Sequence, residues 1–65
     1  MNYKDVTAVV AYANNDMRLT SAALEAKVDY RTLSLRLDNV YRKTGLDPKR
    51  FRDLVKLVNA IEETQ

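Results

Sequence analysis

The sequence predicts an all-α fold, a small single domain of four helices over residues 1–65. Apolar residues recur at the three- and four-residue spacing of helices through most of the chain. The chain holds only one Gly and one Pro, so its helices have few breaks. Residues of the types that cap helix ends stand between the apolar runs. With 46% hydrophobic and 31% charged residues, the composition is that of a globular domain.

The first helix is expected at about residues 3–14. Asn2 is placed to cap its N-terminus, and Asp5 in the first turn complements the positive end of the helix dipole. The apolar stripe of this helix follows at positions i, i+3, i+4 and i+7: Val6, Val9, Val10 and Ala13.

Two helices joined by a tight turn are expected over about residues 20–44. Thr20 is placed to cap the first of them and Asp29 the second, each side-chain oxygen accepting from a free backbone N–H. Val28 and Leu33 stand at the two positions of a hydrophobic staple, which fixes the direction of the second helix as it leaves the turn. The arrangement predicts a helix-turn-helix.

The second helix of this pair is expected over residues 30–44, ending at Gly45, which adopts the left-handed conformation at no steric cost. Small side chains let the two helices cross closely, and a buried stripe follows: Ala22, Ala23, Ala26, then Leu33, Leu37 and Val40. The same spacing turns another set outward: Tyr30, Arg31, Ser34, Leu35 and Asp38.

The last helix is expected at about residues 48–62. Asp47 reads as its N-cap and Pro48 as its first residue, with Leu46 and Phe51 as a second staple. The helix carries a wide apolar stripe: Phe51, Leu54, Val55, Leu57, Val58 and Ile61.

That wide stripe has two uses. Most of it is expected to cover the small core, and the rest is a candidate seam between two copies of the chain, because helix-turn-helix proteins commonly read two half-sites. Leu57 and Ile61 are the candidate contacts of such a homodimer.

Positive charge is concentrated in the central part of the chain. The net charge is only +2, but residues 27–52 hold eight basic and three acidic side chains, a net +5, whereas residues 1–26 sum to −1 and residues 53–65 to −2. A basic segment around a helix-turn-helix is typical of phosphate contact. The competing interpretation is that these Lys and Arg side chains only keep a helical surface soluble.

The motif predicts sequence-specific binding of double-stranded DNA, with the helix over residues 30–44 in the major groove, because the outward residues near the start of this helix reach base edges. The candidate base contacts are Tyr30, Arg31, Ser34 and Leu35. Arg31 can donate two hydrogen bonds to guanine, with a phosphate contact or a solvated charge as alternatives. The candidate DNA backbone contacts are Thr20, Lys27, Thr32, Arg36, Arg42, Lys43, Lys49 and Arg50. For Arg36, Arg42 and Lys43, intramolecular ion pairs are the alternative.

A family resemblance runs through residues 14–61. The run SAALEAKVDYRTLSLRL, followed by TGLDPKRF and an apolar helix, resembles the C-terminal helix-turn-helix domain of PucR/CdaR-type bacterial transcriptional regulators and, more distantly, the DNA-binding end of Fis. Its most specific pieces are Thr32-Leu33, Arg36-Leu37 and Thr44-Gly45-Leu46-Asp47. The resemblance implies a DNA-binding regulator from a bacterium or phage.

The chain departs from the family at Asp29, Arg31 and Leu35, where such domains often show His or Ser, then Asn, and later Tyr. The target sequence therefore does not carry over. The family's long sensor domain has no counterpart in these 65 residues, and Met1 stands just before a capped helix, which together favour a small stand-alone regulator.

Several function classes are disfavoured by what the sequence lacks. Without His, Cys, a Gly-rich phosphate loop or clustered carboxylates, we expect no enzyme activity, no metal site and no cofactor. No apolar run reaches the length of a membrane span and no signal peptide opens the chain, so a cytoplasmic location is expected. The main alternative to DNA binding is a protein-interaction module, an adaptor or antirepressor built on a helix-turn-helix scaffold. The outward Leu35 and the acidic C-terminal segment favour it.

Overall fold

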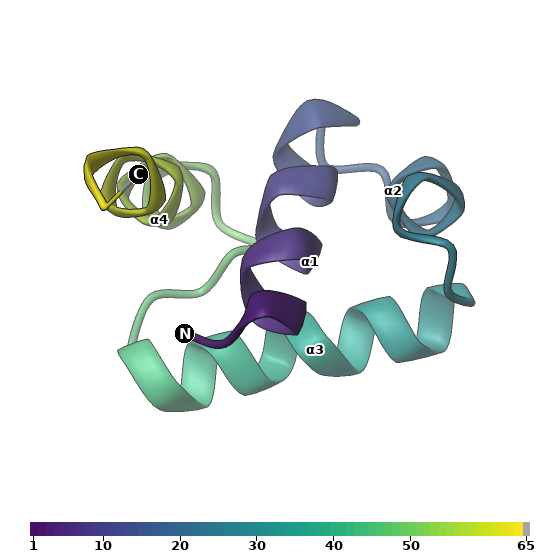
Figure 1. The fold of residues 1–65 in the computed structure, drawn as a ribbon, viewed down its shortest axis with the longest axis horizontal. Coiled ribbons are helices and arrows are strands. Elements are labelled where there is room, and N and C mark those ends of the chain that lie inside the picture. Colours follow the sequence, from purple (N-terminus) through teal and green to yellow (C-terminus); the bar gives the residue numbers. More distant parts are fainter. Residues whose placement is uncertain (65) are drawn as a thin grey trace.

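One central helix organises the packing of the domain. The computed structural model describes residues 1–64, and in this range the elements are α1 (Tyr3–Asn14), α2 (Leu19–Ala26), α3 (Tyr30–Thr44) and α4 (Phe51–Glu63), with no strand. α1 packs against each of the other three helices, α2 and α3 also pack on each other, and α4 packs on α1 alone (Figure 1). The prediction of an all-α domain with four helices is confirmed, while Gln65 lies outside the described residues.

Three predicted helix ends are confirmed by their capping bonds. The side chain of Asn2 accepts from the backbone N–H of Asp5, with Oδ1 and N 2.8 Å apart, at the start of α1. Asp29 Oδ1 accepts from the backbone N–H of Thr32 at 2.8 Å at the start of α3. Gly45 ends α3 with a φ of 76°, a conformation that favours glycine.

The predicted cap of α2 is wrong. α2 begins at Leu19, one residue before Thr20, and its N-cap position is Arg18, whose side chain makes no capping bond. The backbone carbonyl of Arg18 accepts from the N–H of Ala22 at 3.0 Å, so the first helical turn already includes Thr20. Just before this turn Asp16 and Met17 take positive φ values, 55° and 64°, where the chain changes direction between α1 and α2. α2 therefore starts directly after this turn and without a threonine cap.

The predicted start of the last helix is also wrong. α4 begins at Phe51, with Arg50 at the N-cap position, so Asp47 and Pro48 do not act as its cap and first residue. The side chain of Asp47 instead accepts from the N–H of Lys49 at 2.9 Å, and its carbonyl accepts from the N–H of Arg50 at 2.9 Å. Asp side chains favour such short turns because they compete with helix formation for nearby N–H groups.

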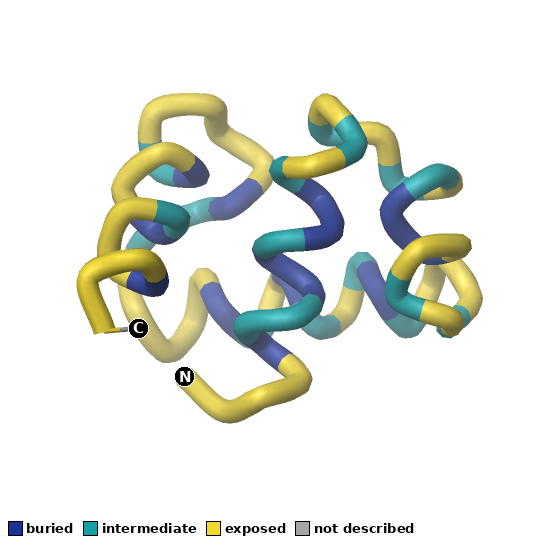
Figure 2. Tube along the Cα trace, turned by 45° about the horizontal axis from the view of Figure 1, so that its top comes forward, coloured by how far each residue is buried: buried dark blue, intermediate teal, exposed yellow. Residues whose placement is uncertain are grey.

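The core is formed where the inner faces of α2, α3 and α4 meet α1 (Figure 2). The predicted stripe of α3 is confirmed, since Leu33, Leu37 and Val40 are fully buried. Of the predicted stripe of α1 only Val9 is buried, while Val6, Val10 and Ala13 are half-buried. Ala8, Ala11 and Tyr12 are buried as well, because three helices cover α1 on more than one side. The complete set of buried apolar residues is Ala8, Val9, Ala11, Tyr12, Ala22, Ala23, Leu33, Leu37, Val40, Leu54, Leu57 and Ile61.

α4 turns its stripe differently from the prediction. Leu57 and Ile61, the candidate contacts of a homodimer, are buried in the core. They pack within the domain and are not exposed to a second copy of the chain. Phe51 and Val55 face solvent instead, and Phe51 is 68% exposed. The predicted staple between Leu46 and Phe51 is therefore absent. The reason is positional: α4 starts three residues later than predicted and meets only α1, so a narrow strip of its surface suffices for packing.

Replacing Asp29 with Ala is expected to lower the melting temperature by a few degrees, because the backbone N–H of Thr32 loses its acceptor. That N–H, assisted by the charge of Arg31, also holds the pKa of Asp29 below its ordinary value of 3.8. The stabilisation is thus present above the unfolded-state pKa and is lost as the pH falls through the folded-state pKa. Thermal unfolding followed by circular dichroism at about pH 7 and about pH 3 measures both effects. Asp29→Asn is the control, since its side-chain oxygen can still cap; an Ala variant that melts like the parent at neutral pH would contradict the assignment.

Leu57→Ala is expected to reduce the free energy of unfolding by about 2 to 5 kcal/mol, because the Leu57 side chain is only 2% exposed and its removal leaves a cavity. Phe51→Ala on the same helix is expected to change it by less than about 0.5 kcal/mol, because the ring is in solvent. Urea unfolding of the two variants checks the orientation of α4, and a larger loss for Phe51→Ala would show that the helix is turned the other way.

Candidate nucleic-acid interface

The predicted base-contact residues lie together on one exposed side of α3. We call this surface the α3 face: Tyr30, Arg31, Ser34, Leu35 and Asp38. With Leu19 of α2, these side chains line a shallow hollow of about 330 Å³. Ser34 is half-buried and the other four residues are exposed. Helical periodicity produces this separation, because the buried leucines occupy the opposite side of the same helix.

The turn between α2 and α3 positions the start of the α3 face. Lys27 takes a left-handed conformation, with a φ of 60°, and the N–H of Val28 donates to the carbonyl of Ala23 at 3.1 Å. α2 is seen almost end-on in Figure 1 while α3 runs across the view, so the two helices cross steeply. The capped N-terminus of α3 therefore lies at the edge of the domain. Its partial positive charge favours a nearby anion.

Arg31 is the free cation at the start of this face. Its guanidinium carbon lies 5.9 Å from the centre of the Tyr30 ring, within the range of a cation–π contact. Among residues 1–64, no hydrogen bond or ion pair takes up its N–H groups. Both side chains are exposed, so the donors of Arg31 are available to a ligand.

Lys49 joins the α3 face from the segment between α3 and α4. Its Nζ lies 3.0 Å from Ser34 Oγ and 3.2 Å from Asp38 Oδ1. Sequence reasoning placed Lys49 beside the face as a phosphate contact and missed this pairing. The sequence shows that Ser34 and Asp38 are neighbours, because they are one helical turn apart. It does not show the contact with Lys49, which depends on how the turn over residues 45–50 folds.

The predicted backbone-contact residues fall into two groups. Thr20, Lys27 and Thr32 lie around the turn and the N-terminus of α3, and Thr20 lines a small hollow together with Asp29 and Tyr30. Arg36 is half-buried on α3, while the remaining residues lie towards the C-terminus of α3 or just after it: Arg42, Lys43, Lys49 and Arg50. The first group borders the α3 face directly. With the rise per residue of an α-helix, Arg42 lies about 16 Å along α3 from Arg31. The cations are therefore spread along the whole helix.

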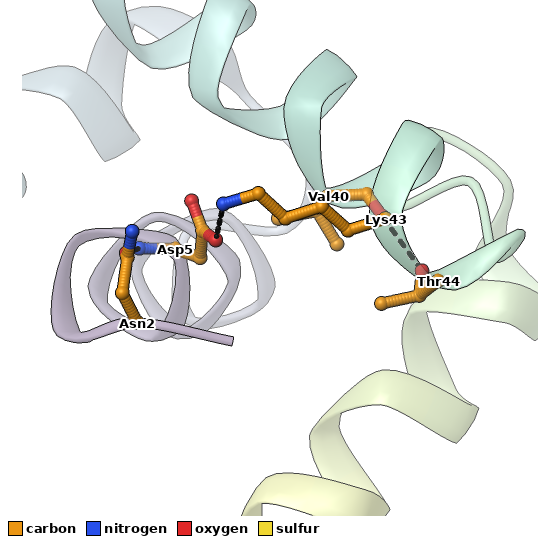
Figure 3. A network of polar contacts seen from close by, with 5 residues as sticks. All are labelled: Asn2, Asp5, Val40, Lys43 and Thr44. Atoms are coloured by element: carbon orange, nitrogen blue, oxygen red, sulfur yellow. Dashed lines mark hydrogen bonds and ion pairs between the residues drawn. The ribbon is translucent and has the colours of Figure 1, made fainter.

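Lys43 makes an intramolecular ion pair with Asp5 of α1. Its Nζ lies 2.8 Å from Asp5 Oδ2, and Figure 3 shows the two side chains extended toward each other from different helices. The Asp5 side chain is only 4% exposed, whereas that of Lys43 is 51% exposed. This is the intramolecular alternative expected for Lys43. The pair joins the start of α1 to the end of α3, so Lys43 has a structural role. The sequence predicted only that Asp5 complements the dipole of α1 and did not predict this partner.

The described residues form no metal site and no membrane-spanning helix. Nowhere in residues 1–64 do three or more His, Cys, Asp or Glu side chains gather in a way that would hold a metal ion. Within the same range, every helix is too short or too polar to cross a membrane.

Comparisons of the chain with protein-family models, with curated proteins and with solved structures find no match in any of the three. The site is therefore described by its own geometry, a capped helix whose first turns carry Arg31, the hydroxyl of Ser34 and the apolar side chains of Tyr30 and Leu35.

Lys43→Met is expected to reduce the free energy of unfolding by about 2 kcal/mol, because the nearly buried carboxylate of Asp5 loses its cation while most of the lysine's aliphatic chain is kept. Arg42→Met is the matched control, an exposed neighbour for which we expect a change below about 0.5 kcal/mol. Chemical denaturation of the three proteins measures the difference. Equal stability of the two variants would show that the pair adds nothing to the fold.

Proposed function

We propose that this protein binds double-stranded DNA with α3 in the major groove and acts as a transcriptional regulator. In this proposal α2, the turn over residues 27–29 and α3 form a helix-turn-helix. The observation that carries it is the α3 face, on which Tyr30, Arg31, Ser34 and Leu35 gather at the capped start of an exposed helix. These are the positions from which such a helix reaches base edges.

The charge distribution supports the same proposal. Residues 27–50, which contain the whole of α3 and the turns on either side of it, hold seven basic and three acidic side chains, so a net charge of +4 lies on α3 and its two turns. Lys27 at one end of the face and Arg42 beyond the other are exposed and lie on the same helix-and-turn unit. Cations spread along a helix in this way can contact phosphates on both sides of a groove.

The chemistry of the face suggests which bases it prefers. Arg31 has free donors for the O6 and N7 atoms of guanine, a pairing worth about 1 to 3 kcal/mol against a wrong base. The hollow beside it has apolar walls from Leu19, Tyr30 and Leu35, which suit the methyl group of thymine. We therefore expect a target that contains guanine next to thymine.

The family resemblance adds weight to the proposal and explains where it is limited. Of the three positions that depart from PucR/CdaR-type domains, Asp29 caps α3, whereas Arg31 and Leu35 lie on the α3 face. Asp29 differs from the family residue but still caps α3, so the helix is kept. Arg31 and Leu35 differ on the α3 face, so the base contacts are expected to differ from those of the family. The proposal is thus a family-like DNA-binding domain with its own target sequence.

A second candidate function is protein binding, and one surface favours it. An apolar groove of about 430 Å³ lies between the end of α1 and α4, lined mainly by Met17, Phe51, Leu54, Val55 and Val58. Exposed apolar surface of this kind is typical of contacts with other proteins, including a second copy of the chain. Salt distinguishes the two functions, because an apolar contact loses little affinity as the salt concentration rises.

The test is selection from a pool of random DNA duplexes, run in parallel on the parent protein, on Arg31→Ala and on Arg52→Ala. Arg52 is an exposed arginine on α4, which makes no contact with α3, so its variant controls for the loss of one charge. We expect a motif from the parent and from the control, and loss of guanine preference with Arg31→Ala. The parent's affinity should fall with salt at a log–log slope of about −0.9 for each phosphate contact.

Failure of the parent protein to enrich any sequence, together with affinity that does not respond to salt, would overturn DNA binding and favour the protein-binding alternative. Enrichment of an inverted repeat would add that two copies bind together, with half-sites about one helical turn apart.

A further inference from the structure

The amino group of Lys49 lies on the α3 face between Ser34 and Asp38. It contacts the hydroxyl oxygen of the first at 3.0 Å and a carboxylate oxygen of the second at 3.2 Å. Lys49 is separated from them by 15 and 11 residues in the sequence, so the contact joins two parts of the chain. The face is therefore composed of α3 and of one side chain from the following turn.

The turn that carries Lys49 is held by its own hydrogen bonds. The backbone N–H of Lys49 donates to Asp47 Oδ1 at 2.9 Å, and the backbone N–H of Asp47 donates to Asp53 Oδ2 at 3.0 Å. Pro48, between them, is buried. A segment closed at both ends and fixed in the middle has little freedom. The backbone of Lys49 is thus directed back onto α3 by a defined turn.

Folding stability does not explain this arrangement. The side chains of Lys49 and Asp38 are 37% and 51% exposed, and an ion pair so accessible to water contributes little to the stability of a fold. A DNA groove changes its surroundings, because water is excluded and phosphates approach. There an unpaired carboxylate at Asp38 would repel the phosphates and would also accept hydrogen bonds from bases.

We infer that Lys49 is a specificity-determining residue that makes the middle of the α3 face a surface of hydrogen-bond donors; this inference rests on the proposed DNA binding. An ammonium group donates three hydrogen bonds and accepts none. Two of the three go to Ser34 and Asp38. The third N–H points away from these partners and is free for a ligand.

The same contact occupies one of the two acceptor positions of the Ser34 hydroxyl oxygen. The O–H of Ser34 is left to donate. With Arg31, the face then offers donors from a guanidinium, an ammonium and a hydroxyl, while the charge of Asp38 is neutralised. Such a face fits the O6 and N7 acceptors of guanine and the O4 acceptor of thymine, and it disfavours the amino group of cytosine.

The test compares four proteins: the parent, Lys49→Ala, Asp38→Ala and the double variant. Lys49→Ala is expected to weaken binding to the motif selected by the parent by roughly 30-fold, because Asp38 loses its counter-ion in the groove. Adding Asp38→Ala is expected to restore affinity to within about threefold of the parent, because the charge that Lys49 neutralised is gone. A residue with only a structural role would show no such restoration.

Base preference gives the second measurement. Selection with Lys49→Ala is expected to enrich cytosine at a position where the parent does not, because the freed carboxylate of Asp38 accepts from the cytosine amino group. The double variant is expected to lose that cytosine. Lys56→Ala, which removes an exposed lysine from α4, is the control and should select the parent's motif. Circular dichroism confirms that each variant is folded.

The outcomes separate the inference from the proposed function. If the parent binds DNA but Asp38→Ala restores nothing and no cytosine appears, the inference is wrong and DNA binding stands. In that case Lys49 would act as an ordinary phosphate contact, and every variant that lacks it would lose about 0.9 from the salt slope. If the parent binds no DNA at any salt concentration, both proposals are wrong.

Discussion

The burial of α1 on three sides is the constraint on which the rest of the fold depends. A helix covered by three others must present small side chains where they approach, and Ala8 and Ala11 are buried on it. It must also place its polar groups at its ends. The one buried charged residue among residues 1–64, Asp5, lies in the first turn of α1, where Lys43 contacts it. With α1 fixed in this way, α2, α3 and α4 each need only one apolar side.

Because α3 needs only one apolar side for packing, its other side is free to form the α3 face, which we propose contacts DNA. Leu33, Leu37 and Val40 account for its burial, and the opposite side of the same helix carries the α3 face. The core residues and the residues of the α3 face thus lie on opposite sides of the same helix. A change on the exposed side leaves the core untouched, so the chemistry of the α3 face can change while the fold is kept.

The sequence predicted the features that depend on neighbouring residues. The caps at Asn2 and Asp29 and the glycine end of α3 are local, because donor and acceptor lie within four residues. The same local rules wrongly predicted Asp47 as the N-cap of α4. Its side chain accepts from the N–H of Lys49 in a short turn, which is an equally local alternative. The periodicity of α3 located the members of its exposed face for the same reason.

What the sequence could not predict depends on distant residues. Asp5 and Lys43 are 38 positions apart, and Lys49 and Asp38 are 11 apart across a turn, so neither pair has a signature in the spacing. The orientation of α4 is similar. Six apolar residues were available for its buried side, and contact with α1 alone determined that Leu57 and Ile61 are buried while Phe51 is exposed.

The attachment of α4 to a single neighbour has a consequence for cooperativity. α2 and α3 each touch two helices and would lose both sets of contacts on opening, whereas α4 can separate by breaking one. Such an element forms its own unit of partial unfolding, which opens at a lower free energy than the whole domain. Its separation would uncover the apolar side of α1 while α2, the turn and α3 keep their mutual packing. The domain therefore contains a three-helix unit with its own mutual packing and a fourth helix whose opening breaks the contacts with α1 and the hydrogen bond from Asp47 to Asp53, which helps to hold the turn that carries Lys49.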